Sequence, residues 1–466
     1  MQLSKIPTTN ILLQLPILKA YQREFAVRMV RIATDRVRQI VCSQVEYSIQ
    51  ISKRQILCIG QEWDLSDWER YIEDIVAENT QLRYTQVINA TGIVIHTNLG
   101  RAPLAKEVRD YVYRCSGYVD VEIDIVENER GGRISGIVDK ITTLVGAEDA
   151  LVVNNNAAAV LLVLAAVMDN AQQKEVLISR GEMVEIGGSF RIPDVITQSG
   201  ALLKEVGCTN KTHLSDYVQA IKDSTGAILR VHPSNYKIQG FTHRPHRTEL
   251  VQLAKKYNIP LIEDVGSGLL QSLPDVPWKE ALRTDELIQF AVQEGVDIIT
   301  ASGDKLMGGP QAGLIIGKKE FVQKCAKHPL YRAFRVDKMV LSALEATLQM
   351  HIEQRSHELP VWEFLQRPLD ICYQIALELV TDIPQATVEE SVGFSGGGAL
   401  PDQAIPTWVV KISVDNPNAL AKRFRQYNPP ILVRVHNQSV YIDTRTLFKE
   451  DISVVRNALE QIILHR

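Results

Sequence analysis

The sequence predicts an α/β protein with a mostly parallel β-sheet and helices on both faces of that sheet. Short apolar runs, which are typical of buried strands, alternate with helical stretches along the central part of the chain. A polar or glycine-rich loop follows almost every run. The composition, 45% hydrophobic and 23% charged residues over 466 positions, is ordinary for a globular protein, and this length favours several domains.

The composition also argues against several classes of protein. No apolar run reaches the roughly 20 residues that a membrane span needs, and Pro7 with its polar neighbours argues against a signal peptide. Six scattered cysteines without a Cys-x-x-Cys pair fit reduced thiols, so we expect a cytoplasmic protein. His243 and His246 have no second ligand pair nearby, and we expect a surface loop there and no metal site.

The first 60 residues are basic although the whole chain has a net charge of −4. They hold nine Lys and Arg against three Asp and Glu, a net charge of +6, which leaves −10 for the rest. Residues 11–42 show helical spacing, with Arg28, Arg31 and Arg38 opposite the apolar positions. Such a stripe fits a basic module at 1–60 that binds a polyanion, or an ordinary solvated helix. Residues 61–86 are predicted to be a linker.

The predicted large domain, residues 87–354, opens with an apolar strand that runs into a polar loop carrying Arg101. This arginine is either a surface residue or a clamp for an anion, beside a helix that begins after Pro103. The glycine-rich basic loop at 129–133, which ends in Arg133, is open to the same two interpretations.

A strand at 150–153 leads directly into Asn154, Asn155, Asn156 and Ala157 and an apolar helix. The free N–H groups and the dipole of a helix N-terminus favour a phosphate at such a junction. As an isolated motif this is weak, because most strand–helix junctions bind nothing.

Four further strand–helix units follow, and sheets of this kind bind ligands at the carboxyl ends of their strands. Asp264 lies at such an end, where a carboxylate can pair with a pyridinium N–H. His232 either contacts a ring at the next strand end or is a core histidine, and we include it and Ser234 among the candidate cofactor-binding residues. The four strands are expected at 175–179, 227–232, 259–264 and 296–300.

The loop at 302–313, Ser-Gly-Asp-Lys-Leu-Met-Gly-Gly-Pro-Gln-Ala-Gly, carries one lysine, Lys305. Glycines on both sides allow the backbone to approach a bulky group. A lysine held in this way is a candidate for a Schiff base with pyridoxal 5'-phosphate, PLP. For a lone lysine, a solvated loop position would be the better interpretation, but the surrounding strand ends favour the cofactor.

A strand at 314–317 returns from this loop, and residues 328–338 are predicted to open a long helix that reaches about residue 353. Arg332 and Arg335 would then share one helical face and suit a small dianion, or form a surface pair. Residues 355–466 are predicted as a small α+β domain. It contains a strand at 407–414, helices at 417–426 and 450–465, and a hairpin around 436–438, and the glycine-rich loop 393–401 leads into it.

Taken together, these motifs resemble the bacterial selenocysteine synthase family, L-seryl-tRNA(Sec) selenium transferase. The matching stretches are long, occur in order and cover most of residues 85–350, and the ends of the chain match more loosely. They are INATGIVIHTNLGRAPL (88–104), LVVNNNAAAVLL (151–162), SRGEMVEIGGSFRIPDV (179–195), SNYKIQGFT (234–242), EDVGSG (263–268), SGDKLMGGPQAG (302–313) and RVDKMVLSALEATL (335–348).

The resemblance implies a fold-type I PLP-dependent transferase with a small basic N-terminal domain and a small α+β C-terminal domain. It implies that Lys305 is the PLP lysine and that Asp264 pairs with the pyridine nitrogen. It implies that Asn155, Asn156 and Ala157 form the phosphate seat.

The resemblance also implies roles for residues around the substrates. Asp304 matches an acidic residue that takes part in the chemistry, and Arg101, Arg332 and Arg335 match arginines that hold the phosphate of the selenium donor, with Arg133 a looser match. The sequence departs from the family pattern at two positions, which are Tyr331, where relatives often have a basic residue, and Cys208, where many have threonine.

The implied function is conversion of L-seryl-tRNA(Sec) to L-selenocysteinyl-tRNA(Sec) with selenophosphate, through a PLP-bound aminoacrylyl-tRNA intermediate. The implied partners are tRNA(Sec) charged with serine, bound by the basic N-terminal module, and further copies of the chain in a homo-oligomer that the family suggests is a homodecamer. Two alternatives remain. One is a PLP lyase that acts on a small free amino acid without tRNA. The other is a tRNA-binding protein that has lost catalysis.

Overall fold

A computed structural model describes residues 6–42, 48–51, 55–58, 63–168, 172, 174–186, 190–233, 235–236, 238–270, 287–398 and 404–464. The chain forms two compact units, Met1–Gln86 and Val87–Arg466. No helix among the described residues is long and apolar enough to cross a membrane.

The first unit is built on two amphipathic helices, α2 (Arg23–Cys42) and α3 (Leu65–Thr80). On α2 the apolar positions, Val30 and Val37 among them, are buried, and the predicted arginine stripe is exposed. The prediction of one helical stretch over 11–42 holds in part, because shorter elements precede α2 near Pro16. The smaller elements are α1 (Thr9–Leu12), η2 (Pro16–Ala20), β1 (Ser48–Ile51) and β2 (Gln55–Cys58).

The segment at 61–86 differs from the linker that the sequence predicted. Asp64 and Asp67 form a capping box that starts α3. Trp68 and Ile72 on this helix are fully buried and belong to the same apolar cluster as the buried side of α2. The buried side of α3 is therefore part of the core of the first unit, which explains its helical spacing, whereas residues 81–86 are exposed.

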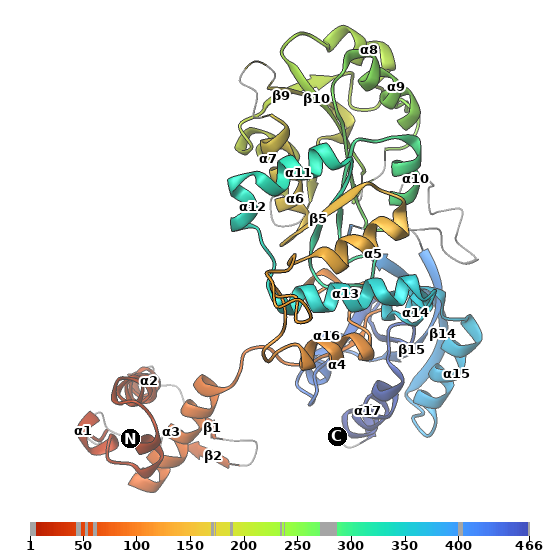
Figure 1. The fold of residues 1–466 in the computed structure, drawn as a ribbon. Helices are drawn as coiled ribbons and strands as arrows, with labels where there is room; N and C mark the ends of the chain where they lie inside the picture. Colours follow the sequence, from red (N-terminus) through yellow and green to blue (C-terminus); the bar gives the residue numbers. More distant parts are fainter. Residues whose placement is uncertain are drawn as a thin grey trace. The chain divides into compact units, whose positions relative to one another are not determined.

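The second unit is organised around a seven-stranded sheet, shown in Figure 1. Six strands run parallel to one another, and only β13 runs against its neighbours β12 and β5. This arrangement confirms the predicted mostly parallel sheet. In spatial order the strands are β5 (Asp149–Val153), β13 (Gly313–Gly317), β12 (Ile298–Ser302), β11 (Leu261–Gly266), β10 (Thr225–Val231), β6 (Glu175–Ser179) and β9 (Leu202–Val206).

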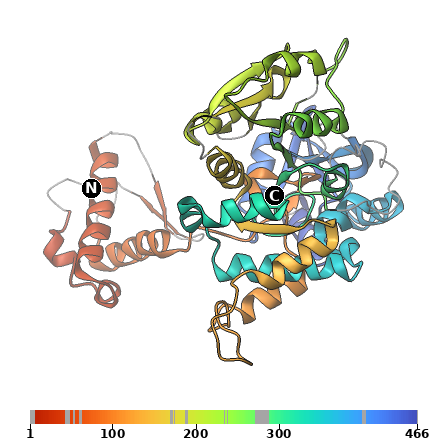
Figure 2. The same cartoon turned by 45° about the horizontal axis from the view of Figure 1, so that its top comes forward.

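Helices cover both faces of this sheet (Figures 1 and 2), and the residues of its inner strands are accordingly mostly buried. Alternate residues of β5 join two different clusters, Val152 one and Val153 the other. One cluster includes residues of α5 (Ser135–Val145), α8 (Leu214–Ala220), α9 (Arg247–Tyr257), α10 (Ile288–Glu294) and α13 (Lys338–Ile352), and the other includes residues of α6 (Asn156–Val167), α7 (Ile192–Gln198) and α11 (Lys319–Lys327).

A second, six-stranded sheet lies in the C-terminal part of this unit. The predicted hairpin is present as the antiparallel strands β16 and β17, in which Arg434 lies opposite Tyr441 and His436 lies opposite Ser439. In order the strands are β3 (Ile88–Ala90), β16 (Ile431–His436), β17 (Ser439–Asp443), β15 (Ala404–Ser413), β14 (Ala386–Gly396) and β4 (Ile93–Ile95). The accompanying helices are α14 (Pro360–Gln366), α15 (Leu369–Val380), α16 (Pro417–Arg425) and α17 (Lys449–Leu459).

The two edge strands of this sheet come from far earlier in the chain. The sequence placed residues 88–95 in the large domain, but β3 pairs with β16 and β4 pairs with β14. Pairing at a free sheet edge satisfies the backbone groups of these two three-residue strands, which are too short to be stable alone. The pairing brings the loop that follows β4 next to the end of β14, and this proximity shapes the site described next.

Candidate active site

Lys305 lies in the loop between β12 and β13 and is buried, with 7% of its surface exposed. The loop is fixed by backbone hydrogen bonds, because the N–H of Leu306 donates to the carbonyl of Ser267 and that of Gly308 donates to the carbonyl of Lys305, both at 3.0 Å. Burial lowers the pKa of the Lys305 amine, and the carboxylates of Asp264 and Asp304 oppose that shift. A buried amine that loses its proton readily is a good nucleophile.

Asp264 lies near the carboxyl end of β11 and is almost fully buried. Its Oδ1 accepts a hydrogen bond from Nδ2 of Asn156 at 2.8 Å and another from Oγ1 of Thr300 at 3.1 Å. Burial raises the pKa of Asp264, while the hydrogen bond from Asn156 and the positive charge of Lys305 act in the opposite direction. The structure thus brings two of the residues expected to contact the cofactor, Lys305 and Asp264, into one buried cluster.

The predicted phosphate seat is the N-terminus of α6, directly after β5. Asn155 is the N-cap, and its side chain accepts from the N–H of Ala158 at 2.9 Å. Ala157 lies in the first turn, where N–H groups have no partner within the helix. Gly313 allows β13 to pass close by, because a Cβ there would lie 2.1 Å from the carbonyl oxygen of Asn155. The side chain of Asn156, which we expected at the phosphate, is directed to Asp264.

Arg101 and Asp304 form an ion pair immediately beside the lysine, with 2.6 Å between Nη1 and Oδ2. The aspartate side chain is 5% exposed and the arginine side chain 36% exposed. The N–H of Ala102 also donates to the carbonyl of Asp304 at 3.2 Å, which ties the loop after β4 to the lysine loop. Arg101 therefore joins the buried cluster to solvent, where an anion can approach it.

One contributor to the site was not predicted from the sequence. Gly398, just past β14, comes so close to the lysine that a Cβ built on it would lie 2.7 Å from Nζ of Lys305. The neighbouring Gly397 lies against Thr97, at 3.4 Å by the same measure. The signal was present in the glycine-rich run 393–398, since glycines in a strand often mark the close approach of another group.

The arginines expected to hold an anion are not all alike. Arg133 and Arg335 both pair with Oε1 of Glu122, at 3.0 and 2.7 Å, and Arg133 also donates to the carbonyl of Val336 at 2.7 Å. Arg332 is exposed on α12 (Pro329–Ala333). The carboxylate of Glu122 therefore already neutralises part of the charge of Arg133 and Arg335.

The prediction that Arg332 and Arg335 share one helical face is wrong. α12 ends at Ala333, and α13 begins only at Lys338. The chain breaks between them because Asp337 caps α13, with its side chain accepting from the N–H groups of Met339 and Val340. Only Arg332 is helical, and Arg335 follows the helix end.

The remaining candidate residues lie at the end of β10. His232 is buried, and its backbone N–H donates to the carbonyl of Asp264 at 3.0 Å, so it lies next to the aspartate. Ser234 lies outside the described residues. Within the described part of the chain, no group of three or more His, Cys, Asp or Glu side chains is arranged to hold a metal ion.

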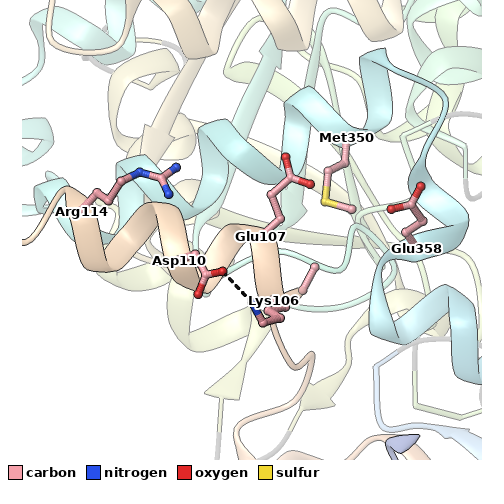
Figure 3. Close-up of a pocket in the computed structure, with 7 residues that line it drawn as sticks. Lys106, Glu107, Asp110, Arg114, Met350 and Glu358 are labelled. Atoms are coloured by element: carbon pink, nitrogen blue, oxygen red, sulfur yellow. Dashed lines mark hydrogen bonds and ion pairs between the residues drawn. The ribbon is translucent and has the colours of Figure 1, made fainter.

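A pocket of about 400 Å³ between α4 (Lys106–Arg114), α13 and the turn near Glu358 contains none of the predicted site residues (Figure 3). In Figure 3 Met350 lies between Glu107 and Glu358. Arg355 pairs with both of these carboxylates, at 2.7 and 2.8 Å. The carboxylates of Glu107 and Glu358 are thus paired within the protein, and the strand-end cluster remains the candidate site.

Comparison with known proteins identifies the family. Residues 87–448 match the model of the family described as L-seryl-tRNA selenium transferase. The chain belongs to this family. An L-seryl-tRNA(Sec) selenium transferase of Alkaliphilus oremlandii is 42% identical over 91% of this chain and 93% of its own length. One from Carboxydothermus hydrogenoformans is 41% identical over 98% of this chain and 97% of its own.

A solved structure supports the fold of this family member. D-Glucosaminate-6-phosphate ammonia-lyase is similar with a TM-score of 0.60, covering 84% of this chain and 98% of its own, at 20% sequence identity. This chain therefore has the fold-type I architecture that its sequence predicts.

Proposed function

We propose that the chain is a PLP-dependent enzyme that converts L-seryl-tRNA(Sec) to L-selenocysteinyl-tRNA(Sec) with selenophosphate. The observation that carries the proposal is the buried cluster at the strand ends, in which Lys305 lies among Asp264, Asp304 and Arg101. Family membership and relatives named for this reaction support it. The cluster also argues against a tRNA-binding protein without catalysis, because none of these groups is lost.

The residues of the site fit PLP. Two polar atoms near the lysine, Oδ1 of Asn156 and Oγ of Ser267, are buried and have no hydrogen-bond partner among the described residues. A polar ligand would supply those partners. We assign Lys305 to the cofactor's aldehyde carbon, Asp264 to its ring nitrogen, and the N–H groups around Ala157 to its phosphate.

When bound, PLP withdraws electrons from the α-carbon of the seryl group. The amine of Lys305, whose pKa is lowered by burial, takes the α-proton and later returns a proton. Asp264 keeps the ring nitrogen protonated. Asp304 holds Arg101 in place, and the guanidinium binds the phosphate of the selenium donor.

The partners follow from the same proposal. Exposed arginines on α2 bind the tRNA backbone, and the protein acts in the cytoplasm as a homo-oligomer of the kind that the family suggests. Arg133 and Arg335 are less suited to the donor than Arg101, because Glu122 already pairs with both. Arg332 remains a candidate phosphate ligand.

The backbone at Gly398 provides one prediction. We expect Gly398→Ala to weaken PLP binding about ten-fold, because the methyl group would occupy the space of the lysine amine. Gly200→Ala is the control. The φ angle of Gly200 is +84°, close to the +83° of Gly398, but no atom lies within 4 Å of its Cβ position, so the substitution imposes the same backbone strain away from the site. Fluorescence titration with PLP measures both, and unchanged affinity for Gly398→Ala would contradict this role.

The exposed stripe on α2 provides a second prediction. We expect the double charge reversal Arg28→Glu and Arg31→Glu to weaken binding of seryl-tRNA(Sec) at least ten-fold at low salt and to reduce the salt dependence of binding. Filter binding over a range of salt concentrations measures this, with PLP content unchanged as the control. Equal affinity and an equal salt slope would show that the stripe does not touch RNA.

The proposed function is tested by comparing two substrates on the same holoenzyme. Incubation with seryl-tRNA(Sec) and selenophosphate should yield selenocysteinyl-tRNA(Sec), identified after hydrolysis of the ester by mass spectrometry. Incubation with free L-serine should yield no pyruvate. The reverse pattern, pyruvate from serine and no selenium on tRNA, would assign the protein to the lyases of small amino acids.

A further inference from the structure

The carboxylate of Asp264 is held from two sides, and both donors reach the same oxygen. Nδ2 of Asn156 and Oγ1 of Thr300 lie 2.8 and 3.1 Å from Oδ1. The donors come from different elements, since Asn156 opens α6 and Thr300 lies in β12. Together with a backbone hydrogen bond from Gly266, these two side-chain donors restrain the orientation of the carboxylate.

The position of Thr300 follows from the sheet. Thr300 is the direct register partner of Asp264 in the parallel pair formed by β11 and β12. Register partners point to the same face of a sheet, so the hydroxyl is presented to the carboxylate by the backbone pairing itself. Thr300 is completely buried, and Asp264 is 4% exposed. Water is therefore a poor substitute for the hydroxyl of Thr300.

We propose that Asn156 and Thr300 are positioning residues that hold Oδ1 of Asp264, so that Oδ2 is the oxygen presented to the ring nitrogen of PLP. This inference rests on the proposed cofactor and adds two residues to its site. It gives the side chain of Asn156 a different role from the phosphate contact expected from the sequence. It also explains why a threonine, and not an apolar residue, stands at a fully buried position of the central sheet.

A purely structural role predicts different behaviour. If Thr300 and Asn156 only supplied hydrogen bonds to a buried carboxylate, removing one donor would destabilise the protein and would affect the binding of PLP and of an analogue without the ring nitrogen equally. If they orient Asp264, removing one donor lowers the affinity only for ligands whose ring nitrogen pairs with that carboxylate. A cofactor analogue without that nitrogen separates the two roles.

The test uses Thr300→Val, which keeps the shape of the side chain and removes the hydroxyl. The full-length apoprotein is titrated with PLP and with 1-deazapyridoxal phosphate, in which a CH group replaces the ring nitrogen. We expect Thr300→Val to weaken PLP binding about ten-fold and to change binding of the analogue less than two-fold. Thr300→Ser, which restores the hydroxyl, should recover at least half of the lost affinity on a logarithmic scale.

Thr347→Val is the matched control. Thr347 is also completely buried, but its hydroxyl donates to the carbonyl of Ala343 within its own helix, at 2.8 Å. We expect this variant to bind both ligands as the wild type does. The melting temperature of each apoprotein shows whether the variant is folded before ligand is added.

Three results would overturn the proposal. Equal loss of affinity for PLP and for the analogue in Thr300→Val would show a structural role only. Unchanged PLP affinity in Thr300→Val and in Asn156→Ala would show that the donors do not position Asp264. If the wild type bound PLP no more tightly than the analogue, Asp264 would not meet the ring nitrogen. A wild type that bound neither ligand would refute the proposed cofactor, whereas the first two results leave the cofactor intact.

Discussion

Replacement of Lys305 by alanine is expected to lower the single-turnover rate of selenocysteinyl-tRNA formation by about 10³-fold or more. In the proposed function one amine both attaches the cofactor and transfers the α-proton, and proton transfer alone contributes about 10²–10⁴-fold. The buried position and lowered pKa of this amine suit both tasks, whereas an exposed loop lysine would be protonated. The rate is measured by rapid quench with excess enzyme over seryl-tRNA(Sec).

Lys327→Ala is the control for this experiment, because Lys327 is exposed at the end of α11. The control should retain the wild-type rate, and both variants should bind seryl-tRNA(Sec) with unchanged affinity. A Lys305→Ala protein that still formed product at more than a tenth of the wild-type rate would remove the lysine from the mechanism. Loss of tRNA binding in the same variant would instead indicate misfolding.

Replacement of Asp264 by asparagine is expected to lower the rate about 10²-fold or more without lowering the melting temperature of the apoprotein. Asparagine has the same shape but cannot keep the ring nitrogen protonated. Burial raises the folded-state pKa of Asp264 above its unfolded value. Because the unfolded chain ionises this carboxyl group more readily, a raised folded-state pKa lowers stability at pH 7, and this cost disappears at low pH. The neutral side chain removes that cost.

The melting temperature of Asp264→Asn at pH 7 is therefore expected to equal or exceed that of the wild type, with the difference decreasing as pH falls. Asp337→Asn is the control, since asparagine is as good a helix cap as aspartate. That variant should show wild-type activity and stability. Wild-type activity in Asp264→Asn would contradict the assignment of this carboxylate to the ring nitrogen.

Much of the fold could be predicted because it depends on local patterns. The inner strands of the large sheet are mostly apolar and buried on both faces, so they appear as short apolar runs, whereas the edge strand β9 is partly exposed and was not predicted. Parallel order then places the loops after β11 and β12 at one edge, which is why Asp264 and Lys305 were expected together. The sequence motifs that resemble those of the selenium transferases added the residue roles, which geometry alone does not assign.

The parts that could not be predicted depend on contacts between distant segments. Gly398 lies beside Lys305 just past the pairing of β14 with β4, and although its glycine run signals a close approach, no local pattern reports a pairing between residues about 300 positions apart. The hydrogen bond between Asn156 and Asp264 likewise joins two strand ends. Asp337 as a helix cap could have been recognised from the sequence, and it would have separated Arg332 from Arg335.

The central claim, that PLP is held by Lys305 in this cluster, is tested most directly by locating the cofactor on the chain. Purified protein is reduced with borohydride, which fixes the cofactor to the lysine that holds it, and its peptides are sequenced by mass spectrometry. We predict a phosphopyridoxyl group on Lys305 at close to one per chain, and none in Lys305→Ala. A label on any other lysine, or wild-type protein purified with PLP that carries no label after reduction, would contradict the account.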